Sequence, residues 1–167
     1  GQKPPYERVD IIQSVGPSPN AAVSASRLGL DARLMAWVGS DQVGQEAITY
    51  LKSENVATEA MVTEQHKATS YWYVLRYKAD RTMLVKSEKY NYVWRDPQDE
   101  PDWIYLSYIG ENSWQLHLDL LAYLEKHPMV KLAFQPGTFH FKWGTDRLAD
   151  IYRRSHIVVM NREEAVE

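Results

Sequence analysis

The sequence contains no cysteine, which excludes disulfide bonds and metal sites built from thiolates. The absence of cysteine fits a reducing compartment, and we expect a cytoplasmic protein. No stretch approaches the roughly 20 apolar residues that a membrane-spanning helix needs, and residues 1–5 lack the apolar run of a signal peptide. We therefore expect no membrane partner.

A strong charge of either sign is also missing, because the formal net charge is −3. Lysine and arginine are adjacent only at Arg153-Arg154, a cluster too short to follow a phosphate backbone, so we expect no nucleic-acid partner. The histidines lack the spacing of metal ligands, and we expect no histidine metal site. They are His66, His117, His127, His140 and His156.

The 167 residues are enough for one domain with its own core or for a large part of a bigger one. The aromatic content is unusual, with 11 Tyr and 6 Trp against 3 Phe. Amphipathic rings suit wet contact surfaces and stack on sugars and bases. They also fill cores when their polar tips find partners, which is the role we expect for most of them.

The first part of the chain alternates between helical and strand patterns. Residues 20–28 are rich in alanine and follow a proline, which predicts a helix with Asn20 as its N-cap and Gly29 at its end. An apolar strand is predicted at residues 33–38 and a second helix at 41–54. This progression is typical of a parallel sheet.

Residues 69–85 change to an alternating pattern, which predicts a β-hairpin that turns at residues 78–80. One face carries Tyr71, Tyr73, Leu75 and Tyr77. That face could cover a ligand, clasp a second copy of the chain, or pack on its own domain. Residues 9–12 could pair with the hairpin.

The helix and strand alternation resumes after a polar connector at residues 96–101. The expected elements are a strand at 103–107, a helix at 113–127 capped by Ser113, a strand at 130–134, a loop at 135–138, a helix at 145–155 and a strand at 157–160. We therefore predict a three-layer, Rossmann-like α/β fold with a mainly parallel sheet and a small β lid. Its parts are an N-terminal lid segment (1–14), an α/β core (15–66), the lid hairpin (67–95) and the continuing α/β core (96–167).

The last predicted strand ends at Asn161, and Glu164 follows three residues later. Ligands of α/β sheets gather where strands end and helices begin. An amide followed by a carboxylate at this spacing suits a hydrated metal ion and phosphate oxygens. The alternative is a strand-end asparagine and a solvated glutamate that the helix dipole favours in a first turn.

Four segments, in this order, resemble motifs of the ribokinase-like (PfkB) carbohydrate and nucleoside kinases. They are Gly16-Pro17-Ser18-Pro19-Asn20 with Arg27-Leu28-Gly29, Val38-Gly39-Ser40-Asp41-Gln42-Val43-Gly44, Phe134-Gln135-Pro136-Gly137-Thr138, and Asn161-Arg162-Glu163-Glu164-Ala165. The ordered set spans nearly the whole chain and is far more specific than any one motif. The resemblance implies the ribokinase-like fold, with ATP and Mg²⁺ as cofactors.

The resemblance also implies which residues form the site. The substrate-binding residues would be Gly16, Asn20, Gly39, Asp41 and Asn91. Asn161 would position phosphate oxygens or the metal's shell, and Glu164 would hold Mg²⁺ through water. For Asn20 the alternative is a plain N-cap, and Asn91 matches the family less well because tyrosines flank it.

The chain departs from the family pattern in several places. Val15 stands where most members have glycine, and Gln135 stands where Asp or Asn is usual. The family's opening strand, with a substrate-binding Asp, has no counterpart in this sequence. Neither has the G-x-G-D segment, which holds the general base and an anion hole. We therefore expect the sequence to be incomplete, and the catalytic base to belong to an absent C-terminal segment.

Two functions remain open from the sequence. One is ATP-dependent phosphorylation of a sugar or nucleoside hydroxyl, by a kinase that pairs with a second copy through the lid. The other is a non-catalytic small-molecule-binding or oligomerisation module on the same fold, since a fold does not fix a function. An unrelated dinucleotide-binding domain is a weaker third option, because no G-x-G-x-x-G follows a strand.

Overall fold

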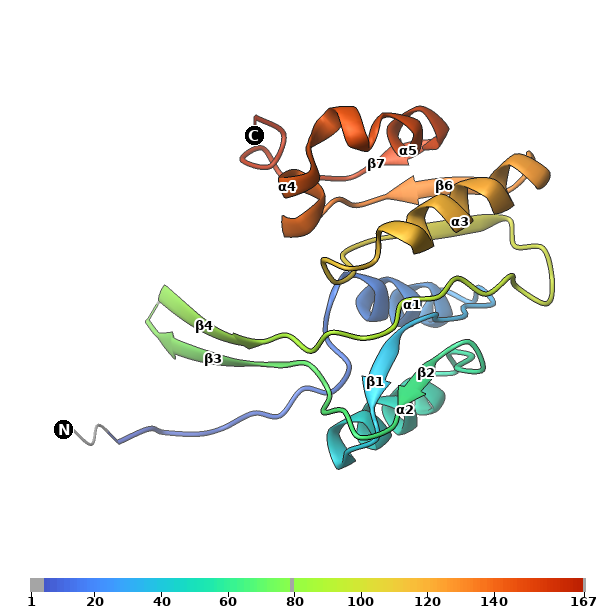
Figure 1. The fold of residues 1–167 in the computed structure, drawn as a ribbon. Helices are drawn as coiled ribbons and strands as arrows, with labels where there is room; N and C mark the ends of the chain where they lie inside the picture. The colour runs from blue at the N-terminus through green and yellow to red at the C-terminus, as the bar shows by residue number, and fades with distance from the viewer. Residues whose placement is uncertain (1–4, 79, 167) are drawn as a thin grey trace.

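The computed structural model describes residues 5–78 and 80–166, and Figure 1 shows their arrangement. The helices are α1 (Pro17–Arg27), α2 (Gln42–Ser53), α3 (Trp114–Lys126), α4 (Thr138–Arg147) and α5 (Ala149–Arg154). The strands are β1 (Trp37–Gly39), β2 (Val62–Glu64), β3 (Tyr71–Tyr77), β4 (Asp80–Lys86), β5 (Trp103–Leu106), β6 (Lys131–Phe134) and β7 (Ile157–Val158). None of the helices in these ranges is long and apolar enough to cross a bilayer.

The fold is the predicted mixed α/β type, with parallel sheets and an antiparallel lid. β1 and β2 form one parallel pair, and β6 lies between β5 and β7 in a parallel sheet of three strands. Within the described residues the parallel strands thus form two sheets rather than one. β7 runs parallel to β6, as the prediction required.

Each parallel sheet has its own apolar core. α5 contacts both β6 and α3. The side chains that α3, α5 and β6 contribute to the centre of this core are at most 1% exposed: Leu120, Leu124, Leu132, Phe134 and Ile151. The β1–β2 unit is held by a smaller cluster: Ala22, Val23, Leu34, Leu51 and Val56. The small side chains of α1 allow the helix to approach this cluster closely.

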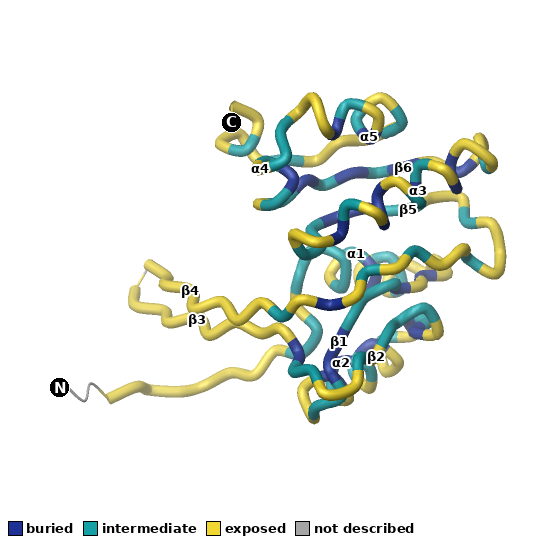
Figure 2. Tube along the Cα trace, in the orientation of Figure 1, coloured by how far each residue is buried: buried dark blue, intermediate teal, exposed yellow. Residues whose placement is uncertain are grey.

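The hairpin β3–β4 projects from the α/β body (Figure 1). Its strands pair from Tyr71↔Lys86 to Tyr77↔Asp80, and every residue of both strands is exposed, as Figure 2 shows in yellow. The hairpin therefore does not pack on its own domain. Ala79, in the predicted turn, lies outside the described residues.

Residues 5–14 are extended and form no strand, so the predicted pairing of residues 9–12 with the hairpin is absent from the described structure. Ile11 and Ile12 are 83% and 75% exposed. Residues 1–4 of the predicted lid segment lie outside the described residues.

The start of α1 corrects one prediction. Gly16, not Asn20, is the N-cap, and the helix begins at Pro17. Proline suits the first helical position, because that position has no intrahelical partner for an N–H and its φ is already helical. Gly16 has φ 147°, a region that favours glycine. Asn20 lies inside the first turn, where its backbone N–H donates to the carbonyl of Gly16 at 3.0 Å.

Three further boundaries differ from prediction. β1 covers residues 37–39 and so includes only residues 37 and 38 of the predicted 33–38 strand, and Arg33 makes an isolated bridge to Ala57. α4 begins inside the predicted loop, at Thr138. The predicted helix at 145–155 is divided between α4 and α5, and Gly144, with φ 79°, interrupts α4. A glycine can leave the helical conformation at little cost, which is why the break falls there.

Candidate substrate and phosphate site

A wide cleft of about 2710 Å³ opens between the lid, residues 5–19 and the facing strands β1 and β5. Its lining includes Gly16, the hairpin residues 71–78 and the β5 residues 103–106. Aromatic rings and polar groups line it. Its volume exceeds the roughly 300–1,000 Å³ of an ordinary small-molecule pocket, so a small ligand would occupy only part of it. We call this space the lid cleft.

Gly16 lies at one wall of the lid cleft. A Cβ built on Gly16 would lie 3.7 Å from Cδ of Pro19, an ordinary contact, so its positive φ rather than a lack of space requires glycine. Two residues further on, the Ser18 and Ser107 hydroxyls are 2.5 Å apart. Ser107 is buried just after β5, so this bond fixes the start of α1 at the carboxyl end of a sheet strand.

The Asp41 carboxylate accepts hydrogen bonds from Gly44 and Thr69. Its Oδ1 accepts hydrogen bonds from the Gly44 N–H at 3.0 Å and the Thr69 hydroxyl at 2.6 Å, and its Oδ2 accepts from the Thr69 N–H at 2.8 Å. Burial raises the pKa of Asp41, but the hydrogen bonds from Thr69 and Gly44 outweigh it and hold the pKa below the ordinary value. Asp41 thus joins the N-terminus of α2 to the residues just before β3.

The glycines of the same turn are required by close packing. A Cβ on Gly39 would lie 2.3 Å from the carbonyl oxygen of Lys67, and a Cβ on Gly44 would lie 2.3 Å from that of Gly39. The Gly39 N–H donates to the Thr69 hydroxyl at 3.0 Å. Gly39 and Asp41 therefore lie at the base of the lid, and neither belongs to the lining of the lid cleft.

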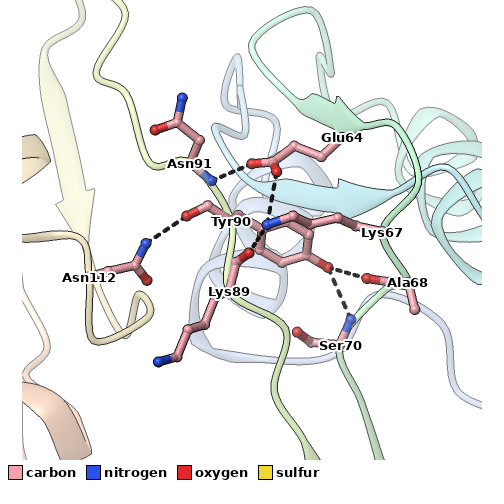
Figure 3. Close-up of polar contacts among 8 residues, drawn as sticks. All are labelled: Glu64, Lys67, Ala68, Ser70, Lys89, Tyr90, Asn91 and Asn112. Carbon is pink, nitrogen blue, oxygen red and sulfur yellow. Dashed lines mark hydrogen bonds and ion pairs between the residues drawn. The ribbon is translucent and has the colours of Figure 1, made fainter.

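Tyr90 ties the two ends of the lid together (Figure 3). Its hydroxyl donates to the carbonyl of Ala68 at 2.9 Å and accepts from the Ser70 N–H at 3.2 Å. The Asn112 side chain donates to the Tyr90 carbonyl at 2.7 Å, which links the lid base to the loop after β5. Tyr90 is 4% exposed, and burial raises its pKa.

Asn91 follows directly and contacts the same region through its backbone. Its N–H donates to Oε1 of Glu64, whose Oε2 lies 3.3 Å from the Lys67 ammonium. The Asn91 side chain is exposed and points away from Glu64 (Figure 3). Neither Asn91 nor Asn20, which is also exposed, belongs to the lining of the lid cleft in this conformation.

Asn161 and Glu164 form a reciprocal pair after β7. The Asn161 N–H donates to Oε2 of Glu164 at 2.9 Å, and the Glu164 N–H donates to Oδ1 of Asn161 at 2.8 Å. The residues after Asn161 form turns rather than a regular helix. The structure thus places the two residues in contact after a strand, each side chain accepting from the backbone of the other. Their role toward phosphate and Mg²⁺ stays a prediction.

The donor atoms of this pair fit a weakly held Mg²⁺. No group of three or more acidic or histidine side chains suited to a metal occurs in the described part of the chain. Mg²⁺ usually takes one or two carboxylates and completes its shell with water and substrate phosphates. The Glu164 carboxylate and the Asn161 amide oxygen are hard donors of this kind.

A contact between two histidines has no signal in the sequence. His117 and His140, which lack the spacing of metal ligands, lie with their Nε2 atoms 2.9 Å apart. Ser113 occupies the predicted N-cap position of α3, but its buried hydroxyl makes no hydrogen bond within the described structure. Its carbonyl instead lies 2.8 Å from Nδ1 of His117. The 23-residue separation of the histidines carries no periodic signal.

The parallel strands, with loops at their carboxyl ends, and the antiparallel lid form an α/β architecture of the kind in which ligands bind at that edge of the sheet. Residues 13–167 match the model of the pfkB family carbohydrate kinases. The chain belongs to this family.

Relatives with solved structures share the fold. The uncharacterized sugar kinase PH1459 of Pyrococcus horikoshii is 39% identical over 70 residues, which cover 42% of this chain and 23% of PH1459. Its structure in complex with ATP has a TM-score of 0.73 at 21% identity and covers 90% of this chain and 55% of that chain.

Two other relatives with solved structures are named as kinases of different substrates, a sugar and a nucleoside. A fructokinase from Vibrio cholerae, bound to fructose, ADP and calcium ion, has a TM-score of 0.65 at 18% identity and covers 90% of this chain and 57% of its own. A nucleoside kinase from Methanocaldococcus jannaschii has a TM-score of 0.68 at 16% identity, with 88% and 48% covered. The chain spans about half the length of these solved relatives.

Proposed function

We propose that the complete protein, meaning the gene product that contains residues 1–167, transfers the γ-phosphate of ATP to a hydroxyl of a sugar or nucleoside. The observation that carries this proposal is the family match over residues 13–167. The lid cleft supports it, because its lining includes residues 107–110, which follow the carboxyl end of β5. The ATP complex of PH1459 and the fructose complex of the Vibrio cholerae enzyme are consistent with a nucleotide and a sugar on this fold.

Each candidate residue has a proposed part. The acceptor enters the lid cleft, where the backbone at Gly16 allows close approach. The Asn20 amide, which is exposed outside the cleft lining in this conformation, can both donate to and accept from hydroxyls and meets the acceptor when the site closes. Asp41 and Gly39 position the lid base, and Asn91 reaches the acceptor when the lid closes. Asn161 and Glu164 serve the phosphate end, with Glu164 acting on Mg²⁺ through water.

Phosphoryl transfer depends mainly on positioning and on neutralising charge, with a base for the attacking hydroxyl. Mg²⁺ would supply charge neutralisation at the phosphates. The 167 residues contain no G-x-G-D sequence. We propose that the base and the backbone amides facing the transferred group come from outside residues 1–167.

The exposed lid supports a second part of the proposal, a homodimer. The side chains of β3 and β4 include Trp72, Tyr73, Leu75, Tyr77 and Leu84, which are between 44% and 73% exposed. An antiparallel hairpin with two uncovered apolar faces needs a partner surface to remain unaggregated. The lid of a second copy is the partner we propose.

The test is a panel of sugars and nucleosides with the complete protein. Thermal-shift measurements identify an acceptor, and a coupled assay with ATP and Mg²⁺ then measures turnover. We expect one chemical class of acceptor to raise the melting temperature and to be phosphorylated. Binding without turnover would favour the non-catalytic module, and no response to any acceptor or to ATP would contradict the proposal.

A further inference from the structure

Two buried histidines meet between α3 and α4. His117 and His140 are 0% and 1% exposed, and their rings lie 5.0 Å apart, centre to centre. Aromatic side chains surround them: the ring of Trp143 lies 5.2 Å from His117 and 5.4 Å from His140, and Phe134 lies 5.0 Å from His140. Buried polar rings in such a site must find partners in each other or in the backbone.

The hydrogen bonds of the pair specify where each proton resides. The Gly137 N–H donates to Nδ1 of His140 at 3.0 Å, so this nitrogen carries no proton. The neutral His140 then carries its proton on Nε2 and donates it to Nε2 of His117. His117 in turn carries its proton on Nδ1 and donates it to the carbonyl of Ser113 at 2.8 Å. One arrangement of two neutral rings therefore satisfies every ring nitrogen.

This chain of bonds joins two loops at the carboxyl edge of the sheet. Ser113 ends the loop after β5 and caps α3, whereas Gly137 ends the loop after β6 and caps α4. β5 and β6 are adjacent and parallel, so both loops lie on the side of the sheet where ligands bind. Neither histidine belongs to the lining of the lid cleft.

The charged side chain that faces this site is Arg147, from the last turn of α4. Its guanidinium carbon lies 4.1 Å from the ring centre of Trp114 and 5.2 Å from that of Trp143. Burial lowers the pKa of His117, with a smaller lowering from the charge of Arg147. Burial and His117 together lower the pKa of His140 to about 3. The pair is thus neutral at physiological pH.

We propose that His117 and His140 are positioning residues for the phosphoryl transfer. Their hydrogen bonds hold the loop of residues 135–137 in register with the loop of residues 107–113, so the backbone at the carboxyl edge is already in place when the acceptor and phosphate arrive. This inference rests on the proposed function for its kinetic consequence, but the proton arrangement and the loop contact stand on their own.

The kinetic test compares two substitutions that each keep half of the bonding of His140. His140→Asn keeps an acceptor for the Gly137 N–H and loses the bond to His117, whereas His140→Gln keeps a donor near His117 and loses the bond to Gly137. The matched control is His66→Asn, at an exposed position whose φ of 61° asparagine tolerates.

In the complete protein we expect each His140 variant to lower kcat by about tenfold or more, because misplacing the site by a fraction of an ångström is costly. The acceptor KM should change less than about twofold, since the pair does not touch the lid cleft. The control should match the wild type. A kcat that stays normal in the folded fraction, judged by circular dichroism, would overturn the positioning role.

The second readout needs no activity. ¹⁵N spectra of the imidazoles should show the proton on Nδ1 of His117 and on Nε2 of His140. The His140 ring should not titrate between pH 8 and 5, and the His117 ring should titrate below its ordinary value of 6.5. The Gly137 amide should exchange slowly in the wild type and at least about tenfold faster in His140→Gln. The opposite tautomers, or titration near pH 6.5, would overturn the inference. If these results are obtained but no acceptor is phosphorylated, the proposed function is wrong while the inferred proton arrangement and loop contact remain supported.

Discussion

Asp41 accepts two hydrogen bonds from Thr69, one from its backbone and one from its hydroxyl, across 28 positions of sequence. The same carboxylate caps α2 through the Gly44 N–H. One side chain thereby fixes the angle at which the chain leaves the α/β body to form the lid. In this structure the Asp41 carboxylate is hydrogen-bonded at the base of the lid, and its binding of substrate stays a prediction.

Replacing Asp41 should destabilise the protein markedly. Asp41→Ala removes a helix cap and leaves the Thr69 N–H and hydroxyl without their acceptor, at a cost of about 2–4 kcal/mol in the free energy of unfolding. Because the pKa of Asp41 is lowered, this contribution is present above the ordinary carboxyl value near 4 and lost as the pH falls further. Urea unfolding at pH 7 measures the loss, and Thr69→Ser serves as the control. A change below about 0.5 kcal/mol would show that the network contributes nothing.

The histidine pair predicts a specific acid sensitivity. Both histidines have lowered pKa values in the folded state, to about 3 for His140, whereas unfolded histidine titrates near 6.5. Their stability contribution is therefore complete above pH 6.5 and declines as the pH falls below that value, toward about 3 for His140. Over that range His140 contributes a slope of about 1.4 kcal/mol per pH unit.

Unfolding free energies at pH 7.5, 6.5, 5.5 and 5.0 measure this slope. His140→Asn should reduce it by about 1.4 kcal/mol per pH unit, since one titrating group is gone. His66→Asn should leave it unchanged. Equal slopes in the wild type and His140→Asn would mean that His140 is not held neutral in the folded state.

Asn20 offers a clean test of the substrate side, because it is exposed and does not cap its helix. Asn20→Ala should leave stability within about 0.5 kcal/mol. In the complete protein it should weaken acceptor binding by about 1–3 kcal/mol, through lost hydrogen bonds to hydroxyls, and leave ATP binding intact. Calorimetric titration of each ligand separates the two effects. An unchanged acceptor affinity removes Asn20 from the site.

Glu164 is predicted to act through Mg²⁺ and not as the base. Glu164→Gln keeps an oxygen for the Asn161 N–H, so the turn stays intact. The Mg²⁺ concentration for half-maximal activity should rise about tenfold, with much of the activity restored at high metal. Glu163→Gln, at the exposed neighbour, is the control. Loss of activity at every Mg²⁺ concentration would indicate a direct role instead.

Residues 1–167 expressed alone should not phosphorylate any acceptor. They contain the Asn161–Glu164 pair and the lid cleft but no G-x-G-D segment, and the groups that stabilise the transferred charge dominate this chemistry. The exposed lid and open sheet edges should also drive self-association. Light scattering and an ATP turnover assay test both expectations. A stable monomer that turns over ATP at an ordinary kinase rate would contradict them.

Periodicity alone predicted the α/β alternation, the hairpin and the direction of β7, because burial on one face imposes a visible pattern. The boundaries failed where one residue's backbone decides them. Pro17 starts α1 four residues earlier than an Asn20 cap would. Gly144 interrupts α4, which begins at Thr138, before the helix predicted from residue 145. Residue propensities are averages over many proteins, whereas each boundary here depends on the backbone torsion angles of a single residue.

The site was predictable only where its parts are close in sequence. Asn161 and Glu164 are three residues apart, and the structure brings them into direct contact. The bond between Asp41 and Thr69 and the contact between His117 and His140 depend on how distant strands and helices meet. No local sequence pattern indicates which distant elements come together, so these two contacts could be recognised only in the folded structure.

Because the lid is long, the hydrogen bonds at its base determine where its far end lies. Each strand has seven residues, so the hairpin extends about 24 Å beyond its root. If the hairpin rotates as a rigid unit by about 10° about its base, its far end moves by about 4 Å. The hydrogen bonds of Asp41 and Tyr90 at the base of the hairpin therefore control the position of its far end. A small lengthening of these bonds would move the aromatic side chains at that end by several ångströms.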